Sequence, residues 1–191
     1  MSSLAIVGSG GFGREVEQWA KYSGYNHIAF YVSDNLCNDE LPLSILPIDM
    51  PTVIAIGNPT VRMQLVKEMS RNQNYDRIIH KTAMTSSYNN GMILCPYAVI
   101  TTNVIAGRHL HMNLHSDIGH DCVIGNYVTL APGARVSGYC VIGDCVYIGT
   151  NAVIREGVHI CDGVTIGAGA VVLNDITESG VYAGVPAKKI K

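Results

Sequence analysis

The chain contains no stretch of 18 consecutive apolar residues, and its N-terminus has neither the basic segment nor the cleavage site of a secretory signal. The sequence therefore predicts no transmembrane helix, no membrane partner, and a soluble cytoplasmic protein. Charged residues make up only 15% of the 191 positions and leave a formal net charge of -2. Without a basic stripe, no nucleic-acid partner is expected.

Cysteine pairs of the Cys-x-x-Cys kind are also missing, although the chain has 6 cysteines. Their absence argues against a structural zinc site. Cys122 and Cys140 occupy the same position of two hexads in the repeat described next, and three hexads separate them. We expect them to be two small buried thiols in a reducing compartment, with a disulfide as the alternative.

The strongest pattern that is present is a six-residue repeat, which runs without an insertion from Leu94 to Val172. The first position is a large apolar residue in every hexad except the one that begins at Ala106, and the fifth position is mostly small. Such a short fixed period predicts a parallel β-helix, in which three hexads form one triangular coil with the first-position side chains inside. The first positions are Leu94, Ile100, Ala106, Met112, Ile118, Ile124, Leu130, Val136, Ile142, Ile148, Ile154, Ile160, Ile166 and Val172.

A coil of three hexads fixes which residues become neighbours in space. Parallel strands lie about 4.8 Å apart, so each residue should lie over the one three hexads later. This spacing predicts contacts between His120 and Gly138 and between Thr150 and Ala168. The glycines that directly follow a first position, such as Gly119, are expected to permit the bends at the corners.

The segment before the repeat alternates strand and helix patterns. Apolar runs at 4–7, 27–32 and 52–56 predict strands, and helical spacing follows the first and the third of them. The turn after the first strand, Gly8 to Gly13, has the spacing G-x-G-x-x-G, which can hold a pyrophosphate at the start of the helix. We therefore expect a Rossmann-like α/β half domain at residues 1–85, followed by a β-helix at residues 86–191.

Two features argue against an NAD site in this first domain. The acidic residue that usually grips the ribose is missing from the end of the second strand, since Asp34 lies just beyond Ser33. The domain also leaves little room for a complete cofactor site. A nucleotide sugar is the expected ligand, and a tight turn without a ligand is the alternative.

The hexads Ile142 to Tyr147 and Ile166 to Val171 read Ile-Gly-x-x-Val/Ala-x, a pattern that resembles the left-handed β-helix of hexapeptide-repeat acyltransferases. With its N-terminal domain, the chain resembles the bacterial sugar O-/N-acetyltransferases of the sialic acid O-acetyltransferase type. The resemblance implies a homotrimer with acetyl-CoA as co-substrate between subunits and no metal. It also implies N-acetylation of a nucleotide-linked 4-amino-4,6-dideoxy sugar for surface glycan biosynthesis, with O-acetylation of a sialic acid type sugar as the alternative.

The same resemblance implies catalytic roles in the segment Ile118-Gly119-His120-Asp121. Transfer of an acetyl group needs a base for the nucleophile's proton and a donor for the oxyanion. His120 is expected to be the general base and Asp121 to orient it, while the backbone N–H of Gly138 forms the oxyanion hole. An outward histidine without a catalytic role is the alternative.

The binding residues are likewise implied by the resemblance. The acetyl-CoA contacts are Gly138, Gly149, Thr150, Gly167, Ala168 and Lys188. The nucleotide-sugar contacts are Gly10, Gly11, Phe12, Val32, Ser33, Gly57 and Asn58, with His115 as a further lining residue of the acceptor pocket. Some relatives have histidine at the place of Phe12 and of Thr129 and a carboxylate near Val32, so the sequence does not identify the nucleotide. His109, His111 and His159 are expected at the surface or in an interface.

Two further readings of the histidines stay open. The γ-type carbonic anhydrases use the same prism and place two zinc-binding histidines five residues apart, as His115 and His120 are. Their third ligand would fall at Ile79, with His80 next to it but ahead of the repeat. A non-catalytic scaffold is the other alternative, and it predicts that the protein does not bind acetyl-CoA.

Overall fold

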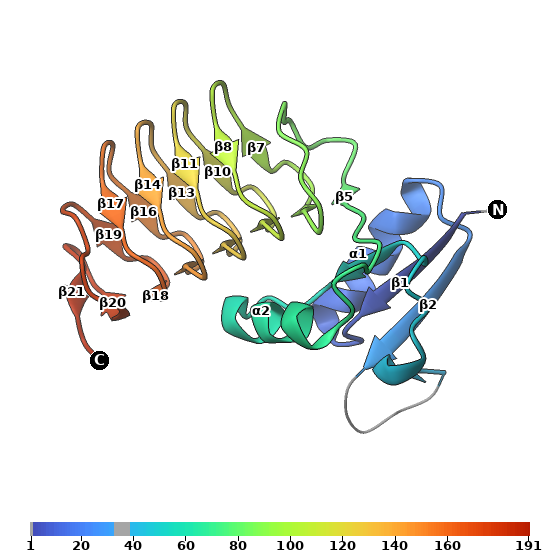
Figure 1. Ribbon diagram of the computed structural model, residues 1–191. Helices are drawn as coiled ribbons and strands as arrows, with labels where there is room; N and C mark the ends of the chain where they lie inside the picture. Colours follow the sequence, from blue (N-terminus) through green and yellow to red (C-terminus); the bar gives the residue numbers. More distant parts are fainter. Residues whose placement is uncertain (1, 33–38) are drawn as a thin grey trace.

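The computed structural model describes residues 2–32 and 39–191, so the predicted sugar contact Ser33 lies outside the described residues. The chain forms an α/β domain followed by a long prism of stacked coils (Figure 1). The predicted parallel β-helix with an N-terminal α/β region is thereby confirmed. None of the helices in the described ranges is long and apolar enough to span a bilayer.

The α/β domain is built on one parallel sheet with the strand order β3-β2-β1-β4. Its helix α1 begins within the glycine turn that follows β1. The first N–H groups of the helix have no partner inside the helix, so the turn presents them as free donors. The strand β3 was not predicted, and β4 ends two residues earlier than expected. The elements are β1 Ser3–Val7, α1 Gly11–Tyr22, β2 His27–Val32, β3 Leu41–Pro42, the 3-10 helix η1 Leu43–Ile45, β4 Thr52–Ile54 and α2 Pro59–Glu68.

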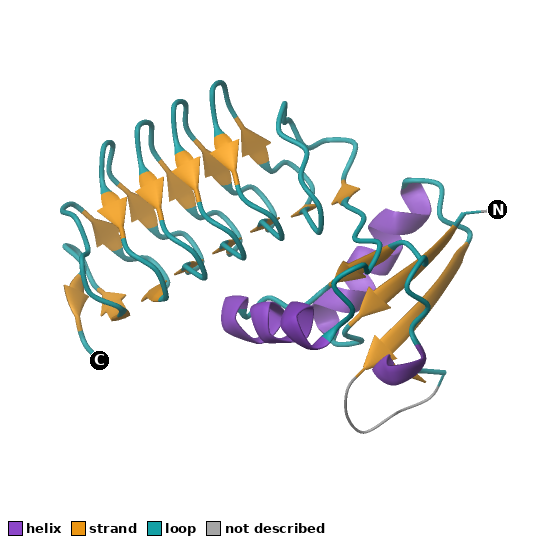
Figure 2. Ribbon diagram, in the orientation of Figure 1, coloured by secondary structure: helices purple, strands orange, loops and turns teal. Residues whose placement is uncertain are grey.

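The prism has three flat faces, each a parallel sheet of short strands (Figure 2). Face 1 contains β5 Ile78–Ile79, β6 Ile93–Leu94, β9 His111–Met112, β12 Thr129–Leu130, β15 Tyr147–Ile148, β18 Val164–Ile166 and β20 Gly180–Ala183, and the antiparallel β21 Lys188–Lys189 ends it. Face 2 contains β7 Val99–Ile100, β10 Asp117–Ile118, β13 Arg135–Val136, β16 Val153–Ile154 and β19 Val171–Val172. Face 3 contains β8 Ile105–Ala106, β11 Val123–Ile124, β14 Val141–Ile142 and β17 His159–Ile160.

The strand pairing confirms the coil of three hexads, since Ile118 pairs with Val136 and Ile124 with Ile142. First-position and fifth-position side chains together form one continuous buried core along the prism. Cys122 and Cys140 stack in that core as free thiols, with the Cys140 N–H donating to the sulfur of Cys122 at 3.4 Å. The register of the repeat alone is sufficient to place them.

The corners turn at a different position from the one that the glycines suggested. The left-handed residues recur at the fourth position of the hexads, as at Asn103, His115 and Asp121, each with a φ of +56°. Gly119 does not adopt this conformation, so the predicted reason for its presence was wrong. A Cβ atom there would lie 2.7 Å from the N atom of Gly138, so the second position is small because the next coil packs directly against it.

The α/β domain covers the first coils of face 1. The strand β5 lies within residues 1–85 but pairs with β6 and opens the prism sheet. Helix α2 contributes Arg62, which is fully buried and donates hydrogen bonds to the carbonyls of Ile56, Tyr127 and Val128 and to the hydroxyl of Thr129. The Thr129 hydroxyl in turn donates to the carbonyl of Gly57 at 2.8 Å, so polar contacts fix the two domains to each other.

Candidate functional site

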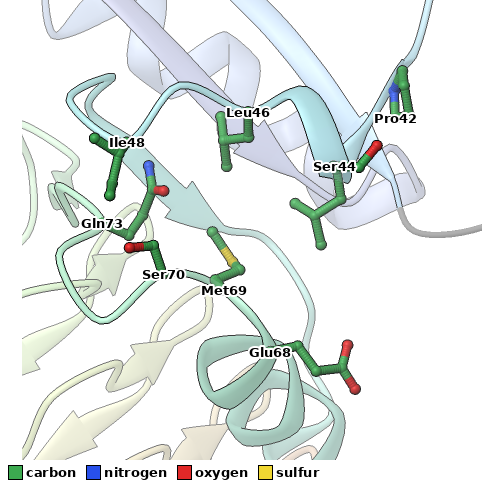
Figure 3. Close-up of a pocket in the computed structure, with 9 residues that line it drawn as sticks. Pro42, Ser44, Leu46, Ile48, Glu68, Met69, Ser70 and Gln73 are labelled. Atoms are coloured by element: carbon green, nitrogen blue, oxygen red, sulfur yellow. The ribbon is translucent and has the colours of Figure 1, made fainter.

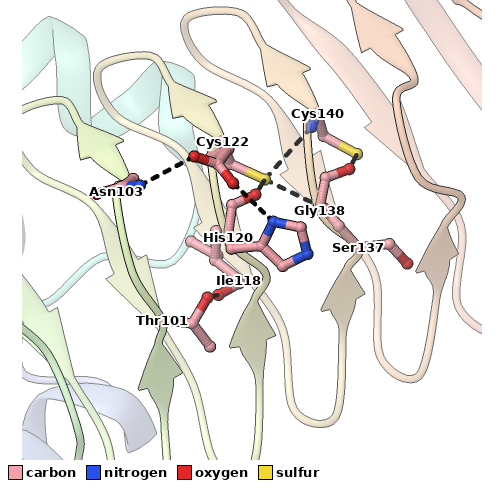
Figure 4. Close-up of polar contacts among 9 residues, drawn as sticks. Thr101, Asn103, Ile118, His120, Cys122, Ser137, Gly138 and Cys140 are labelled. Atoms are coloured by element: carbon pink, nitrogen blue, oxygen red, sulfur yellow. Dashed lines mark hydrogen bonds and ion pairs between the residues drawn. The ribbon is translucent and has the colours of Figure 1, made fainter.

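His120 lies at the corner between faces 2 and 3, in the turn that joins β10 to β11 (Figure 4). Its Nδ1 is 2.8 Å from Oδ2 of Asp121, and the side-chain amide of Asn103, one coil earlier, donates to Oδ1 at 3.1 Å. Hydrogen bonds from His120 and Asn103 hold the pKa of the Asp121 carboxyl below its ordinary value. Because the carboxylate accepts from Nδ1, the neutral ring carries its proton there and leaves Nε2 as a free acceptor.

Gly138 lies under this imidazole ring, as the coil register predicts. A Cβ atom on Gly138 would be 2.7 Å from Cε1 and 2.8 Å from Nε2 of His120, so only glycine allows the ring to rest there. Tyr139 meets the same ring edge to face, with 4.9 Å between the ring centroids. Within the part of the chain that the structure describes, the Gly138 N–H has no hydrogen-bond acceptor. It is therefore available for an oxyanion beside the free nitrogen of His120.

The glycine turn of the α/β domain separates into packing residues and open residues. Gly13 packs against the end of β1, since a Cβ atom there would lie 2.1 Å from the carbonyl oxygen of Gly8. Gly10, the N-cap of α1, and Gly11 are exposed, and a Cβ atom on Gly10 would meet no atom within 4 Å. No acidic side chain occupies the first turn of the helix. The open N-terminus of α1 is thus free to meet a phosphate.

Two adjoining cavities lie between the α/β domain and face 1. A larger one of about 400 Å³ includes Gly57 and the N-cap residue Asn58, whose side chain accepts from the N–H of Val61 at the start of α2. A smaller one of about 130 Å³ includes Phe12 and shares Gly57 and Tyr147 with the first. The smaller cavity is lined by Phe12, Gly57, His111, Asn113, Thr129, Leu130, Ala131, Pro132 and Tyr147. Val32, at the end of β2, lines neither of them.

Four of the predicted acetyl-CoA residues lie at the corner between faces 1 and 2, namely Gly149, Thr150, Gly167 and Ala168. Thr150 and Ala168 are exposed on adjacent coils, and the N–H of Gly169 donates to the carbonyl of Thr150 at 2.8 Å. Gly149 brings the coils close, since a Cβ atom there would lie 2.7 Å from the N atom of Ala168. These four residues do not share the corner of His120, whereas Gly138, another predicted acetyl-CoA contact, lies under the His120 ring.

The C-terminal tail continues this surface. A Cβ atom on Gly167 would lie 3.1 Å from the side chain of Ala183, and Ala183 pairs with Lys188 in the last two strands. Lys188 is exposed at the end of the prism. The tail therefore presents an amino group near the coil of Ala168.

The remaining histidines occupy three different environments. His115 is exposed at the corner between faces 1 and 2, stacked on Tyr97 with 4.9 Å between the ring centroids, and lines neither junction cavity. His159 is exposed on face 3. His109 and His111 are each 2% exposed and lie where the α/β domain covers the prism.

The described residues contain no group of three or more His, Cys, Asp or Glu side chains that could hold a metal ion. His115 and His120 occupy different corners of the prism, so one chain does not bring them to a shared metal ion. A separate cavity of about 460 Å³ lies between η1 and the end of α2, with Leu46, Ile48 and Met69 on its walls (Figure 3). It contains none of the predicted site residues.

Within one chain, the structure thus brings the predicted residues together in separate groups. His120, Asp121 and Gly138 form one group, and Phe12, Gly57 and Asn58 line the junction cavities on the far side of the prism. Sequence reasoning missed Asn103, although it precedes Asp121 by three hexads and the coil register could have found it. Arg62 and the burial of His111 depend on contacts between domains, and no local pattern signals them.

The prism, the α/β domain and the His-Asp pair over a free backbone N–H define a hexapeptide-repeat acyltransferase. Residues 3–69 match the family described as the PglD N-terminal domain, and residues 139–174 match the bacterial transferase hexapeptide repeats. The chain is 33% identical over 159 residues to GDP-perosamine N-acetyltransferase of Escherichia coli O157:H7, a match that covers 73% of this chain and 72% of that protein.

Solved structures agree with this match. The acetyltransferase domain of PglB from Neisseria gonorrhoeae FA1090, in complex with acetyl coenzyme A, has a TM-score of 0.87 at 28% identity, over 98% of both chains. WeeI from Acinetobacter baumannii AYE has a TM-score of 0.88 at 29% identity, over 100% of both chains. The chain belongs to the acetyl-CoA-dependent N-acetyltransferases of nucleotide-linked amino sugars.

Proposed function

We propose that the protein transfers the acetyl group of acetyl-CoA to the amino group of a GDP-linked 4-amino-4,6-dideoxy sugar, with His120 as the general base. The observation that carries this proposal is the free Nε2 of His120 beside the free N–H of Gly138, with Asp121 hydrogen-bonded to Nδ1, the other ring nitrogen. The choice of GDP rests on the relative that is named a GDP-perosamine N-acetyltransferase.

The reaction proceeds by direct attack of the amine on the thioester carbonyl. As the C–N bond forms, the carbonyl oxygen becomes an oxyanion, which accepts a hydrogen bond from the N–H of Gly138. The Nε2 atom of His120 accepts a proton from the attacking amine nitrogen, and Asp121 stabilises the charged ring. The C–S bond then breaks, and the departing thiolate receives the proton. No covalent acyl-enzyme forms.

The proposal assigns the nucleotide sugar to residues 1–85 and the acetyl donor to residues 86–191. The open helix start at Gly10 and Gly11 and the cavities at Phe12, Gly57 and Asn58 serve the sugar nucleotide. The corner at Gly149, Thr150, Gly167 and Ala168 and the amino group of Lys188 serve the CoA moiety. His115, exposed on the same corner, is assigned to the acceptor side of this surface.

The proposed unit is a cytoplasmic homotrimer in which each active site combines two chains. The support is geometric: His120 lies on the opposite side of its own prism from the junction cavities, so one chain does not complete a site. Face 3 also exposes an apolar row beside the His120 corner, with Ile105 at 69%, Val123 at 44% and Val141 at 36%. An apolar row of this kind suits burial against another copy.

The test of the reaction is incubation with acetyl-CoA and a panel of GDP-, UDP- and dTDP-linked 4-amino sugars and sialic acids, with release of the CoA thiol as the readout. We expect an amide product with a GDP-linked amino sugar, and loss of turnover by about 10²–10⁴-fold in His120→Ala. An alkali-labile ester on a sialic acid would instead establish O-acetylation. Turnover that His120→Ala leaves unchanged would remove the proposed base.

The shared site is tested by complementation. Gly11→Glu places a carboxylate where the phosphate should lie and fits the open space at that position, while His120→Ala removes the base. Each variant alone should be inactive, and co-expressed mixed oligomers should recover activity. Inactive mixed oligomers of confirmed composition would contradict a site made by two chains.

A further inference from the structure

His111 is a buried histidine without any hydrogen-bond partner. It lies on β9, in the outward-facing row of face 1, where the α/β domain covers it and the ring of Phe12 lies 5.6 Å away between centroids. Only 2% of the residue is exposed, and neither Nδ1 nor Nε2 has a partner among the described residues. A buried polar atom without a partner costs about 1–3 kcal/mol, so this side chain weakens the protein as it stands.

Burial, reinforced by nearby positive charge, keeps the ring of His111 neutral. Burial, together with the positive charge of Arg62 and the neighbouring His109, lowers the pKa of His111 well below the ordinary value. A neutral imidazole carries one donor and one acceptor. A ligand group that meets it must therefore be polar, and the nearby guanidinium of Arg62 disfavours a second positive charge.

His111 borders the smaller junction cavity of about 130 Å³. The cavity walls are mainly apolar, with Phe12, Leu130 and Pro132 among them, so they do not suit a phosphate. The hydroxyl of Thr129 is already used twice, since it accepts from Arg62 and donates to Gly57. His111 is the polar group of this wall whose side-chain nitrogens are fully buried and lack a partner among the described residues, whereas Asn113 and Tyr147 are only partly buried.

The ring can present a nitrogen to the cavity without movement of the backbone. Both nitrogens are enclosed in the orientation that the structure shows, although the residue borders the cavity. Among the described residues, no hydrogen bond holds this orientation. Rotation about the Cβ–Cγ bond exchanges nitrogen and carbon positions, and this torsion has broad, roughly two-fold minima.

We propose that His111 is a specificity-determining residue that hydrogen-bonds an uncharged hydroxyl of the acceptor sugar in the cavity between Phe12 and Tyr147. This inference rests on the proposed function, because it places the sugar ring at the inner end of the junction cavities. The nucleotide then lies toward Asn58, in the larger cavity that shares Gly57 and Tyr147 with the smaller one. The unpaired imidazole of the free protein is satisfied only when the sugar binds.

The test uses His111→Leu in the full-length protein, because a binding role and a structural role predict opposite changes. Leucine removes the unpaired polar atoms, so the free protein should melt about 2–4 °C higher. The KM for the nucleotide sugar should rise about 10-fold or more, since the sugar hydroxyl loses its partner, while the KM for acetyl-CoA changes less than two-fold. His109→Leu is the matched control: it is equally buried but does not border this cavity, and the KM for the sugar should stay the same.

A series of monodeoxy nucleotide sugars identifies the hydroxyl. Removal of one particular hydroxyl should raise the KM of the wild type by about the same factor as His111→Leu does. The same removal should not raise the KM of the His111→Leu variant further. A lower melting temperature with an unchanged KM for the sugar would overturn the proposal and make His111 a structural residue. Equal losses for all deoxy sugars in both proteins would overturn it as well. If the wild type acetylates none of the sugars, the proposed function itself fails, which is a separate result.

Discussion

The contact between Gly138 and His120 makes a sharp prediction for the substitution Gly138→Ala. The added Cβ atom would lie 2.7 Å from Cε1, 2.8 Å from Nε2 and 3.2 Å from Nδ1 of His120, whereas ordinary contact begins near 3.4 Å. The imidazole must therefore move by at least about 0.7 Å, out of line with its bond to Asp121. The backbone itself accepts alanine, because Gly138 is not left-handed and Ala168 occupies the equivalent position of another hexad.

The expected cost falls on catalysis and not on folding. A displacement of the base by nearly 1 Å costs about 10²-fold in rate, which corresponds to about 2.7 kcal/mol of transition-state stabilisation. We expect kcat/KM to fall by that factor, while the free energy of unfolding changes by less than about 1 kcal/mol. Release of the CoA thiol gives the first quantity, and urea denaturation gives the second.

A double-mutant cycle with His120→Ala shows whether the loss passes through the imidazole. Once the ring is absent, Gly138→Ala has nothing to displace and should cost almost nothing more. Two results would refute this reasoning: a single variant with wild-type kcat/KM, or the same 10²-fold loss in the His120→Ala background. The second result would mean that the alanine acts on the oxyanion hole independently of the base.

Three further predictions concern the site and the junction. Asp121→Asn removes the carboxylate that accepts a hydrogen bond from His120. In the thiol-release assay kcat should therefore fall about 10²-fold, without a change in melting temperature. An unchanged kcat would contradict the orienting role of Asp121. Arg62→Met removes the hydrogen bonds to Tyr127, Val128 and Thr129 across the domain junction. The free energy of unfolding, measured by urea denaturation, should fall by about 2–4 kcal/mol. A loss under about 1 kcal/mol would show that apolar packing holds the domains together. Burial, with the charges of Arg62 and Arg108, lowers the pKa of His109 to about 4, so the unfolded chain binds the proton first. Stability should therefore fall as pH drops from about 6.5 to 4, by on the order of 3 kcal/mol, and His109→Phe should flatten that slope in urea titrations.

The sequence could predict the prism because its signal is local and repeated. Nearly every hexad carries its own large first residue, and the uninterrupted period places His120 next to Gly138 and Cys122 next to Cys140 without knowledge of any contact. The reason for the small second position was beyond such reasoning. A glycine in a turn suggests left-handed backbone, but at Gly119 the deciding factor is the backbone of the next coil at 2.7 Å.

The junction could not be predicted, because its contacts join segments with unrelated periods. Arg62 looks like an exposed residue in the middle of a helix, and only the docking of α2 on face 1 buries it fully against the carbonyls of Tyr127 and Val128. His111 stands in a row of outward-facing side chains, which predicts exposure. The α/β domain covers that row, and burial turns an ordinary surface histidine into a neutral group without a partner.

The same coil arithmetic explains why the proposed base and the predicted acetyl-CoA corner lie apart on one chain. Residues separated by whole coils of three hexads share one edge of the prism, as His120 does with Gly138 and Thr150 with Ala168. His120 and Thr150 are five hexads apart, which is not a whole number of coils, so they occupy different corners on any prism of this period. An acetyl donor that touches both must therefore either wrap around a face of its own prism or run between two chains. The second path agrees with the exposed apolar row on face 3, and it makes the complementation experiment a direct test of the repeat register as well as of the trimer.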